Sequence, residues 1–302
     1  MKSGASFEME DPLSPINAVI KEIDSRPYQG KVLEVRGQSI RIWLPGARLG
    51  EYGYIRPQFG ETPIVPVEVV GFENEYAWVS PMASVNGVSA GSPLIRTGRD
   101  FFITVGRGLL GSVINAFGQN LNGPTQLNEA ESELRSVNAV APDAIRRQRI
   151  RKPFPLGQGQ RISIQGEAGA GKSSLLASIL AGTEADVIVL ALIGERGREV
   201  REWVEDVMTD DVRSRTVTVV ATSDKPAMER VKAAVTATCV AEYFRDTGQH
   251  VLLLLDSVTR YARAWREIGL AAGEPPIRRG FPPSLFAALP SLLERAGPGA
   301  TG

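Results

Sequence analysis

One short motif limits what this chain of 302 residues can fold into more than any other feature. It matches the pattern G-x-x-x-x-G-K-S/T and reads Gly166-Glu167-Ala168-Gly169-Ala170-Gly171-Lys172-Ser173. Glycines let the backbone turn its N–H groups inward around a row of phosphates, and the N-terminus of a following helix favours the negative charge. The motif needs a strand before it and a helix after it, so an α/β sheet is expected here.

Two side chains of this loop supply the chemistry that ATP with magnesium requires. Lys172 can reach the β- and γ-phosphates, and the hydroxyl group of Ser173 can bind Mg²⁺. Ser174, in the first turn of the expected helix, completes a candidate ATP-binding set that begins at Gly166. The alternative is a glycine-rich turn between a strand and a helix, with a lysine that binds nothing.

From about residue 160, apolar runs alternate with helical segments. The expected strands are Arg161–Gln165, Asp186–Gly194, Thr216–Thr222 and His250–Asp256, and the expected helices are Lys172–Ala181, Arg198–Met208, Ala227–Thr247 and Ser284–Arg295. Because these strands are almost continuously apolar, they predict a parallel sheet that is covered by helices on both faces. Residues 160–302 are therefore interpreted as a nucleotide-binding α/β domain.

The first half of the chain has a different pattern. Residues 1–26 are predicted to be a flexible N-terminus with one short helix at most. Residues 27–97 contain short alternating strands such as Lys31–Val35 and Ser39–Leu44, separated by Gly, Pro and Asn, which indicates a small β-barrel-like domain.

Residues 98–159 are interpreted as a connector that contains one basic cluster. The cluster consists of Arg146, Arg147, Arg149, Arg151 and Lys152. We expect a solvated surface or a contact between subunits, with nucleic-acid binding as the alternative. No aromatic residues interleave with the cluster, which argues against a platform for stacking bases.

Two acidic residues and one arginine are candidates for chemistry at the phosphates. Asp256 ends the apolar run Leu252–Leu255 about 80 residues after the loop, as in a Walker B motif, and is expected to face Mg²⁺ directly or through water. Glu195 is either the general base that orients or deprotonates the attacking water, or an acid that stabilises a helix N-terminus. Arg260 is either a sensor of phosphate or of a subunit interface, or a salt-bridge partner.

Composition excludes several other kinds of site. Basic and acidic residues number 34 each, so no overall charge attracts the chain to nucleic acid or anionic lipid. Cys239 and His250 are single residues of their types, which excludes a disulfide within the chain and a Cys/His zinc site. Apolar runs fall far short of the ~20 residues that span a bilayer, so a cytoplasmic location is expected.

Several longer motifs closely resemble the type III secretion ATPases, a family related to the catalytic subunit of rotary ATP synthases. The resemblance is strong over residues 160–297, through segments 191–202, 254–264, 266–276 and 279–297, and looser over 30–125, through 85–88 and 108–118. It implies a RecA-like core with a P-loop, and an N-terminal β region that forms oligomers. Arg278-Arg279-Gly280 favours the injectisome branch of the family over the flagellar branch.

The resemblance also implies a function and partners. Family members form cytoplasmic homohexamers at the inner membrane, and they use ATP hydrolysis to unfold or release export substrates. The implied partners are stator and stalk proteins and chaperone–substrate complexes, with no nucleic acid. By the same resemblance, Lys172 and Glu195 are catalytic and Arg196 is a supporting residue.

The sequence departs from the family pattern at two places. A stretch like T-G-x-R-A-I-D-x-L before the loop's strand is absent, which shortens the chain by about a dozen residues. Family members continue past the position of Gly302 with an arginine finger, an adenine-contacting aromatic residue and a helical domain. Since arginine fingers contribute ~10³–10⁵ in rate, we expect this chain to bind Mg-ATP and hydrolyse it slowly.

Three other functions fit the same motifs. One is a rotary proton-ATPase or flagellar export subunit, and another is a helicase like a transcription terminator, which would be stimulated by RNA. The third is a non-catalytic or degenerate subunit that binds nucleotide without turning it over.

Overall fold

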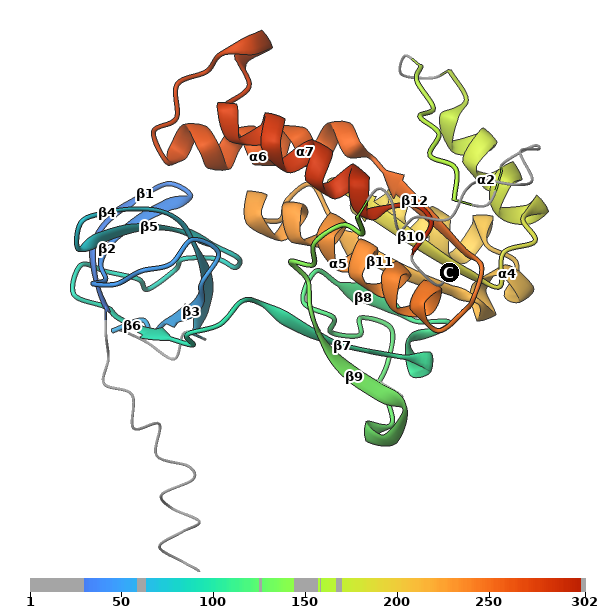
Figure 1. Ribbon diagram of the computed structural model, residues 1–302, viewed down its shortest axis with the longest axis horizontal. Coiled ribbons are helices and arrows are strands. Elements are labelled where there is room, and N and C mark those ends of the chain that lie inside the picture. The colour runs from blue at the N-terminus through green and yellow to red at the C-terminus, as the bar shows by residue number, and fades with distance from the viewer. Residues whose placement is uncertain are drawn as a thin grey trace, which may run out of the picture.

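The computed structural model describes residues 30–58, 64–124, 127–143, 157, 159–166 and 170–299. Figure 1 shows a small barrel at one end of the molecule and a helix-covered sheet at the other. The predicted N-terminal segment 1–26 and the basic cluster at 146–152 lie outside the described residues. Within the described ranges, no helix is both long enough and apolar enough to cross a membrane.

Six short strands close the barrel in the order β1-β2-β5-β4-β3-β6. They are β1 (Gly30–Arg36), β2 (Ser39–Trp43), β3 (Tyr52–Ile55), β4 (Val65–Glu73), β5 (Tyr76–Pro81) and β6 (Pro93–Arg96). Alternate side chains point inward, as the period of a strand requires, and Ile40, Ile42 and Val79 are completely buried inside. The predicted barrel-like domain is therefore confirmed.

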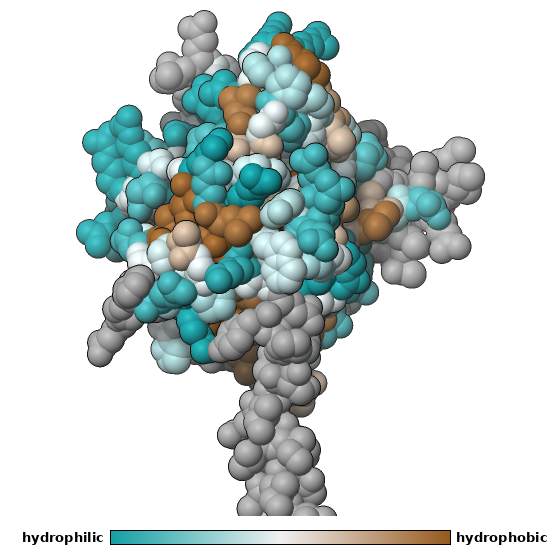
Figure 2. All heavy atoms as spheres, turned by 90° about the vertical axis from the view of Figure 1, so that its left-hand side faces the viewer, coloured by the Kyte–Doolittle hydropathy of each residue, from teal (hydrophilic) through white to brown (hydrophobic). Residues whose placement is uncertain are grey.

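The outer wall of the barrel carries an apolar patch (Figure 2). Exposed large side chains on the strands of the barrel include Leu33, Trp43, Phe72 and Tyr76. Trp43 pairs with Tyr76 across β2 and β5. The guanidinium of Arg41 lies 4.8 Å from the centre of the Tyr76 ring.

Three strands from the second half of the chain and one from the first half, β8, form a parallel four-stranded sheet in the order β12-β10-β11-β8. Its strands are β10 (Val187–Ile193), β11 (Thr216–Ala221), β12 (Val251–Asp256) and β8 (Val113–Asn115). All of β10 is buried, and its side chains alternate between two cores. Val187, Val189, Ala191 and Ile193 join one core, and Ile188, Leu190 and Leu192 join the other. The predicted parallel sheet with both faces covered is confirmed.

Different helices cover the two faces of this sheet. On one face lie α5 (Ala227–Asp246), α6 (Val258–Ala271) and α7 (Pro283–Arg295). The other core takes side chains from α2 (Lys172–Gly182), from α3 (Gly197–Glu202), from the π-helical turn η4 (Trp203–Val207) and from α4 (Asp210–Ser214). The predicted helix 198–208 is thus α3 followed by a π-helical turn.

The additions to the predicted pattern include three strands and one long helix. The segment interpreted as a connector contains β7 (Phe102–Gly106) and β9 (Ser132–Ser136), which form an antiparallel pair, and it also supplies β8 to the parallel sheet. Helix α6 directly follows β12. These four additions lie in segments where short strands or interspersed arginines hide the apolar period.

The predicted strand Arg161–Gln165 is wrong. Residues 161–166 are exposed and pair with none of the strands that the structure describes, although Ile162 and Ile164 alternate as strand residues do. Arg161 instead binds the end of α7, with Nη1 2.8 Å from the carbonyl oxygen of Leu293 and 2.8 Å from Oε1 of Glu294. An alternating pattern makes a strand possible, but a strand forms only where a partner supplies the hydrogen bonds.

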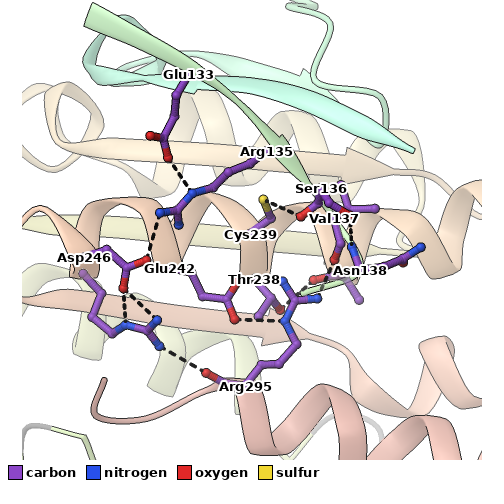
Figure 3. A network of polar contacts seen from close by, with 12 residues as sticks. Glu133, Arg135, Ser136, Val137, Asn138, Thr238, Cys239, Glu242, Asp246 and Arg295 are labelled. Carbon is purple, nitrogen blue, oxygen red and sulfur yellow. Dashed lines mark hydrogen bonds and ion pairs between the residues drawn. The ribbon is translucent and has the colours of Figure 1, made fainter. Parts of the chain in front are cut away.

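A buried ion pair joins three segments on the α5 side of the sheet (Figure 3). The guanidinium of Arg295 in α7 donates to both carboxylate oxygens of Glu242 in α5, at 2.9 and 2.7 Å. It also donates to the carbonyl oxygen of Val137, just after β9, at 2.6 Å. Cys239 lies in the same region and is fully buried.

Candidate functional site

The carboxyl ends of two neighbouring strands bring the predicted acidic residues together. Leu192 in β10 pairs with Asp256 at the end of β12, and Glu195 lies two residues after the end of β10. In parallel sheets this edge is where ligands bind. Glu195 is 9% exposed, and Asp256 is half-buried.

Arg260 reaches back from α6 and holds Glu195. Its Nε lies 2.9 Å from Oε1 of Glu195, and its Nη2 donates to Oε2 at 3.0 Å. Its Nη1 donates to the carbonyl oxygen of Gly194 at 2.7 Å. Of the two interpretations of Arg260, the salt-bridge partner is the one seen in this structure.

Gly194 makes this close approach possible. Its φ of +67° lies in the left-handed region that favours glycine. A Cβ atom at this position would lie 3.0 Å from Cδ of Arg260 and 3.3 Å from its Cβ. Any side chain here would therefore push Arg260 away from Glu195.

Burial changes the protonation of the acidic residues in the site. It raises the pKa of Glu195 to about 7, helped by a hydrogen bond with Glu199 and opposed by the charge of Arg260. The hydrogen bond from Glu195 lowers the pKa of Glu199, which is consistent with Glu195 holding the proton. Burial also raises the pKa of Asp256, against the positive charges of Arg260 and Lys172.

Lys172 begins α2 on the other side of the site. Its Nζ donates to the carbonyl oxygen of Gly166 at 2.5 Å, so the side chain folds back over the glycine loop. Gly171 precedes the helix with a φ of +81°, and a Cβ built there would meet nothing within 4 Å. The described residues therefore leave open space at Gly171, next to Lys172 in the chain. Glu167, Ala168 and Gly169 lie outside the described residues.

The remaining predicted residues lie in the first turns of two helices. Ser173 and Ser174 follow Lys172 in α2 and are exposed. Arg196 precedes α3 and is also exposed, and its Nη1 lies 3.9 Å from Glu199. Arg196 therefore contacts a neighbour of Glu195 and not Glu195 itself.

The donor set of this site fits magnesium bound together with phosphates. Mg²⁺ prefers oxygen ligands and is commonly bound through one or two carboxylates plus substrate phosphates. Asp256 supplies a carboxylate and Ser173 a hydroxyl group, while Lys172 is close enough to affect the charge of Asp256. Within the described ranges, no group of three or more His, Cys, Asp or Glu side chains could hold a metal alone.

Sequence reasoning missed two contacts of Glu195. Glu199 lies four residues after it, a spacing that brings side chains together at the start of a helix, so this contact had a signal. The amide of Ser223, in the loop after β11, donates to the carbonyl oxygen of Glu195 at 3.0 Å. That contact had no signal, because it depends on how β10 and β11 pair.

The raised pKa of Glu195 predicts how stability depends on pH. Between the ordinary value of 4.5 and the folded value of about 7, the folded protein keeps a proton that the unfolded chain releases. This group's contribution to the free energy of unfolding is therefore present below that window and lost as the pH rises through it. Relative to wild type, Glu195→Gln should gain stability from about pH 5 to about pH 8, as measured by urea unfolding.

A matched control is available on the same side of the sheet. Glu202 in α3 is exposed. The free energy of unfolding of Glu202→Gln should differ from that of wild type by the same amount over the whole pH range. If the difference in the free energy of unfolding between Glu195→Gln and wild type is also constant, Arg260 keeps Glu195 ionised over this whole pH range.

Comparison with known proteins gives the family. The model of the ATP synthase alpha/beta family, nucleotide-binding domain, matches residues 149–302. The Type 3 secretion system ATPase of Sinorhizobium fredii (strain NBRC 101917 / NGR234) is 44% identical, over 97% of this chain and 67% of the relative. The Flagellum-specific ATP synthase of Bacillus subtilis (strain 168) is 44% identical, over 92% of this chain and 66% of the relative.

A solved structure agrees with these relatives. The assembled ATPase EscN from the enteropathogenic E. coli type III secretion system superimposes with a TM-score of 0.83 at 45% identity, over 90% of this chain and 67% of EscN. EscN has also been solved in complex with its central stalk EscO. The chain spans about two thirds of the length of these relatives. It belongs to the ATP synthase alpha/beta family, among the type 3 secretion and flagellar ATPases.

Proposed function

We propose that this chain binds Mg-ATP and hydrolyses it as one subunit of an oligomeric motor for type III protein export. The observation that carries the proposal is that Glu195, Asp256 and Arg260 lie together at the carboxyl edge of the sheet. The ammonium group of Lys172 is near enough for its charge to lower the pKa of Asp256 against the effect of burial. A carboxylate base, a carboxylate for a metal and a cation for phosphates are the groups that ATP hydrolysis needs.

Each group has a distinct task in this proposal. Lys172 leaves the carbonyl of Gly166 and binds the phosphates, with backbone N–H groups of the loop. Ser173 and Asp256 would hold Mg²⁺, which supplies charge neutralisation on the phosphate oxygens. Glu195 positions the attacking water and accepts its proton.

Glu195 can act as a base only when it is ionised. Its pKa of about 7 means that the active fraction increases with pH near neutrality. Arg260 offsets the charge that appears, because its guanidinium already contacts both oxygens of Glu195. We place Arg196 in a supporting role at Glu199.

The oligomer and its partners follow from the relatives. EscN is described as assembled and as bound to its central stalk EscO, so we propose a homohexamer that binds a stalk protein. We also propose chaperone–substrate complexes as partners, and a cytoplasmic location at the inner membrane. Both secretion and flagellar ATPases are among the relatives, and we favour the secretion branch.

Phosphate release by wild type and Glu195→Gln tests the proposed reaction. We expect the variant to bind ATP as wild type does and to lose turnover by about 10²-fold or more, because a general base contributes 10²–10⁴. Malachite green measures turnover, and fluorescent ATP measures binding. Glu202→Gln serves as the control for an exposed acid.

Three outcomes would go against this function. Binding without turnover in wild type, at a concentration where the protein is oligomeric, would support a non-catalytic nucleotide-binding subunit. Equal turnover in wild type and Glu195→Gln would remove Glu195 from the reaction. Stimulation of turnover by RNA would favour the helicase alternative.

A further inference from the structure

We propose that Gln38 and Glu68 of the barrel are positioning residues for Glu195, acting through the first turns of α5 and the loop Thr222–Pro226. This inference rests on the proposed role of Glu195. It differs from that role because the two residues come from the other end of the molecule and touch no reacting group.

The first step is the N-terminus of α5, which has no cap of its own. Pro226 precedes the helix and makes no side-chain hydrogen bond to it. The first N–H groups of a helix need partners from outside the helix. Here Gln38, at the turn between β1 and β2, accepts a hydrogen bond from the amide of Ala227 through its Oε1, at 3.0 Å. A barrel side chain thus caps a helix of the nucleotide-binding domain.

The second step is a buried ion pair at the next turn of the helix. The ammonium group of Lys232 contacts Oε2 of Glu68 in β4, and the two side chains are 3% and 13% exposed. Loss of one partner would leave the other charged, buried and unpaired, so the pair strongly favours this single arrangement. Ala227 and Val231 are buried beside it. The barrel therefore holds the first turns of α5 at two points (Figure 1).

The third step connects α5 with the site. Its N-terminus follows directly from the loop Thr222–Pro226, and the amide of Ser223 in this loop donates to the carbonyl oxygen of Glu195 at 3.0 Å. The Nε of Arg230, in the first turns of α5, donates to the carbonyl oxygen of Lys225 at 3.1 Å. The loop is short and bonded at both ends, so a shift of the helix end moves Ser223.

The position of Glu195 therefore has two supports. Arg260 holds its side chain, and Ser223 holds its backbone. The first support comes from α6 and the second, through α5, from the barrel. Lys172 belongs to neither support, because it lies at the start of α2. We therefore expect barrel changes to affect the chemical step more than ATP binding.

Gln38→Ala in the full chain tests this inference, with Gln58→Ala as its control. Gln58 is an exposed glutamine near the barrel, and its Oε1 accepts from Ser89 within the barrel and not from α5. For Gln38→Ala we expect several-fold faster amide hydrogen exchange in residues 222–226, and a several-fold lower kcat with KM for ATP unchanged. Gln38→Glu keeps an acceptor oxygen at the helix N-terminus and should restore both values.

The outcomes separate this inference from the proposed function. Exchange in residues 222–226 that is the same in Gln38→Ala and Gln58→Ala overturns the inference, as does a rise in KM with kcat unchanged. If wild type has no turnover, the proposed function fails, and the exchange measurement alone decides whether the barrel holds this loop. Failure of Gln38→Glu to restore slow exchange would also count against the inference.

Discussion

Arg295→Met should lower the free energy of unfolding by about 3–5 kcal/mol, because it leaves a buried charge without its partner. The side chains of Arg295 and Glu242 are 3% and 7% exposed, and the guanidinium donates hydrogen bonds to both carboxylate oxygens of Glu242. The same change leaves the carbonyl of Val137 without its donor (Figure 3). Three segments distant in sequence would lose their common contact. Urea unfolding followed by circular dichroism measures the effect.

Two further variants separate the ion pair from a general loss of an arginine. Arg36 pairs with Glu34, but the two side chains are 72% and 37% exposed, so Arg36→Met should change stability by less than about 1 kcal/mol. The double variant Arg295→Met with Glu242→Leu should recover most of the loss, since an apolar pair of similar volume can replace a buried ion pair. A loss below about 1 kcal/mol for Arg295→Met alone would show that water reaches this pair.

Lys172→Ala should abolish the stabilisation of the folded protein by ATP. A ligand at 100 times its Kd stabilises by about 2.7 kcal/mol, so wild type should unfold at a clearly higher temperature with saturating Mg-ATP. Without the ammonium group, the phosphates lose the one side-chain cation of the loop, and the shift should vanish. Differential scanning calorimetry with and without Mg-ATP measures it.

The control for this variant is another exposed lysine. Lys225 lies in the loop before α5, and Lys225→Ala should keep the full shift with Mg-ATP. Because Lys172 is exposed and its ammonium group donates to the carbonyl oxygen of Gly166, another exposed group, Lys172→Ala should unfold like wild type when no nucleotide is present. An undiminished shift in Lys172→Ala would mean that nucleotide binds elsewhere.

The fold was predictable where one residue type dominates a segment. The strands β10, β11 and β12 are runs of apolar and β-branched residues, and burial between two helical layers follows directly from that composition. By contrast, β8 has three residues, too few to show a period. In α6 the buried residues Tyr261, Ala264 and Ile268 have helical spacing, but arginines interrupt the apolar pattern.

The site was predictable only in part, for a related reason. Residues that end apolar strands, such as Asp256 and Glu195, can be located because parallel strands share one edge. The contact of Arg260 with Glu195 depends on the pairing of β10 with β12 and on the turn at Gly194. The hydrogen bond from Ala227 to Gln38 joins residues that are 189 positions apart in the sequence, and a local sequence pattern cannot predict a contact of this kind.

The edge of β12 that faces away from β10 affects how the protein associates with other protein chains. Among the described residues, this strand is the last of its sheet, and its apolar side chains are only half-buried. A strand at the edge of a sheet has a row of backbone N–H and C=O groups that can form hydrogen bonds with another extended peptide. At high concentration, copies of the protein would therefore associate through the edge of β12. A strand that pairs with this edge would prevent that self-association.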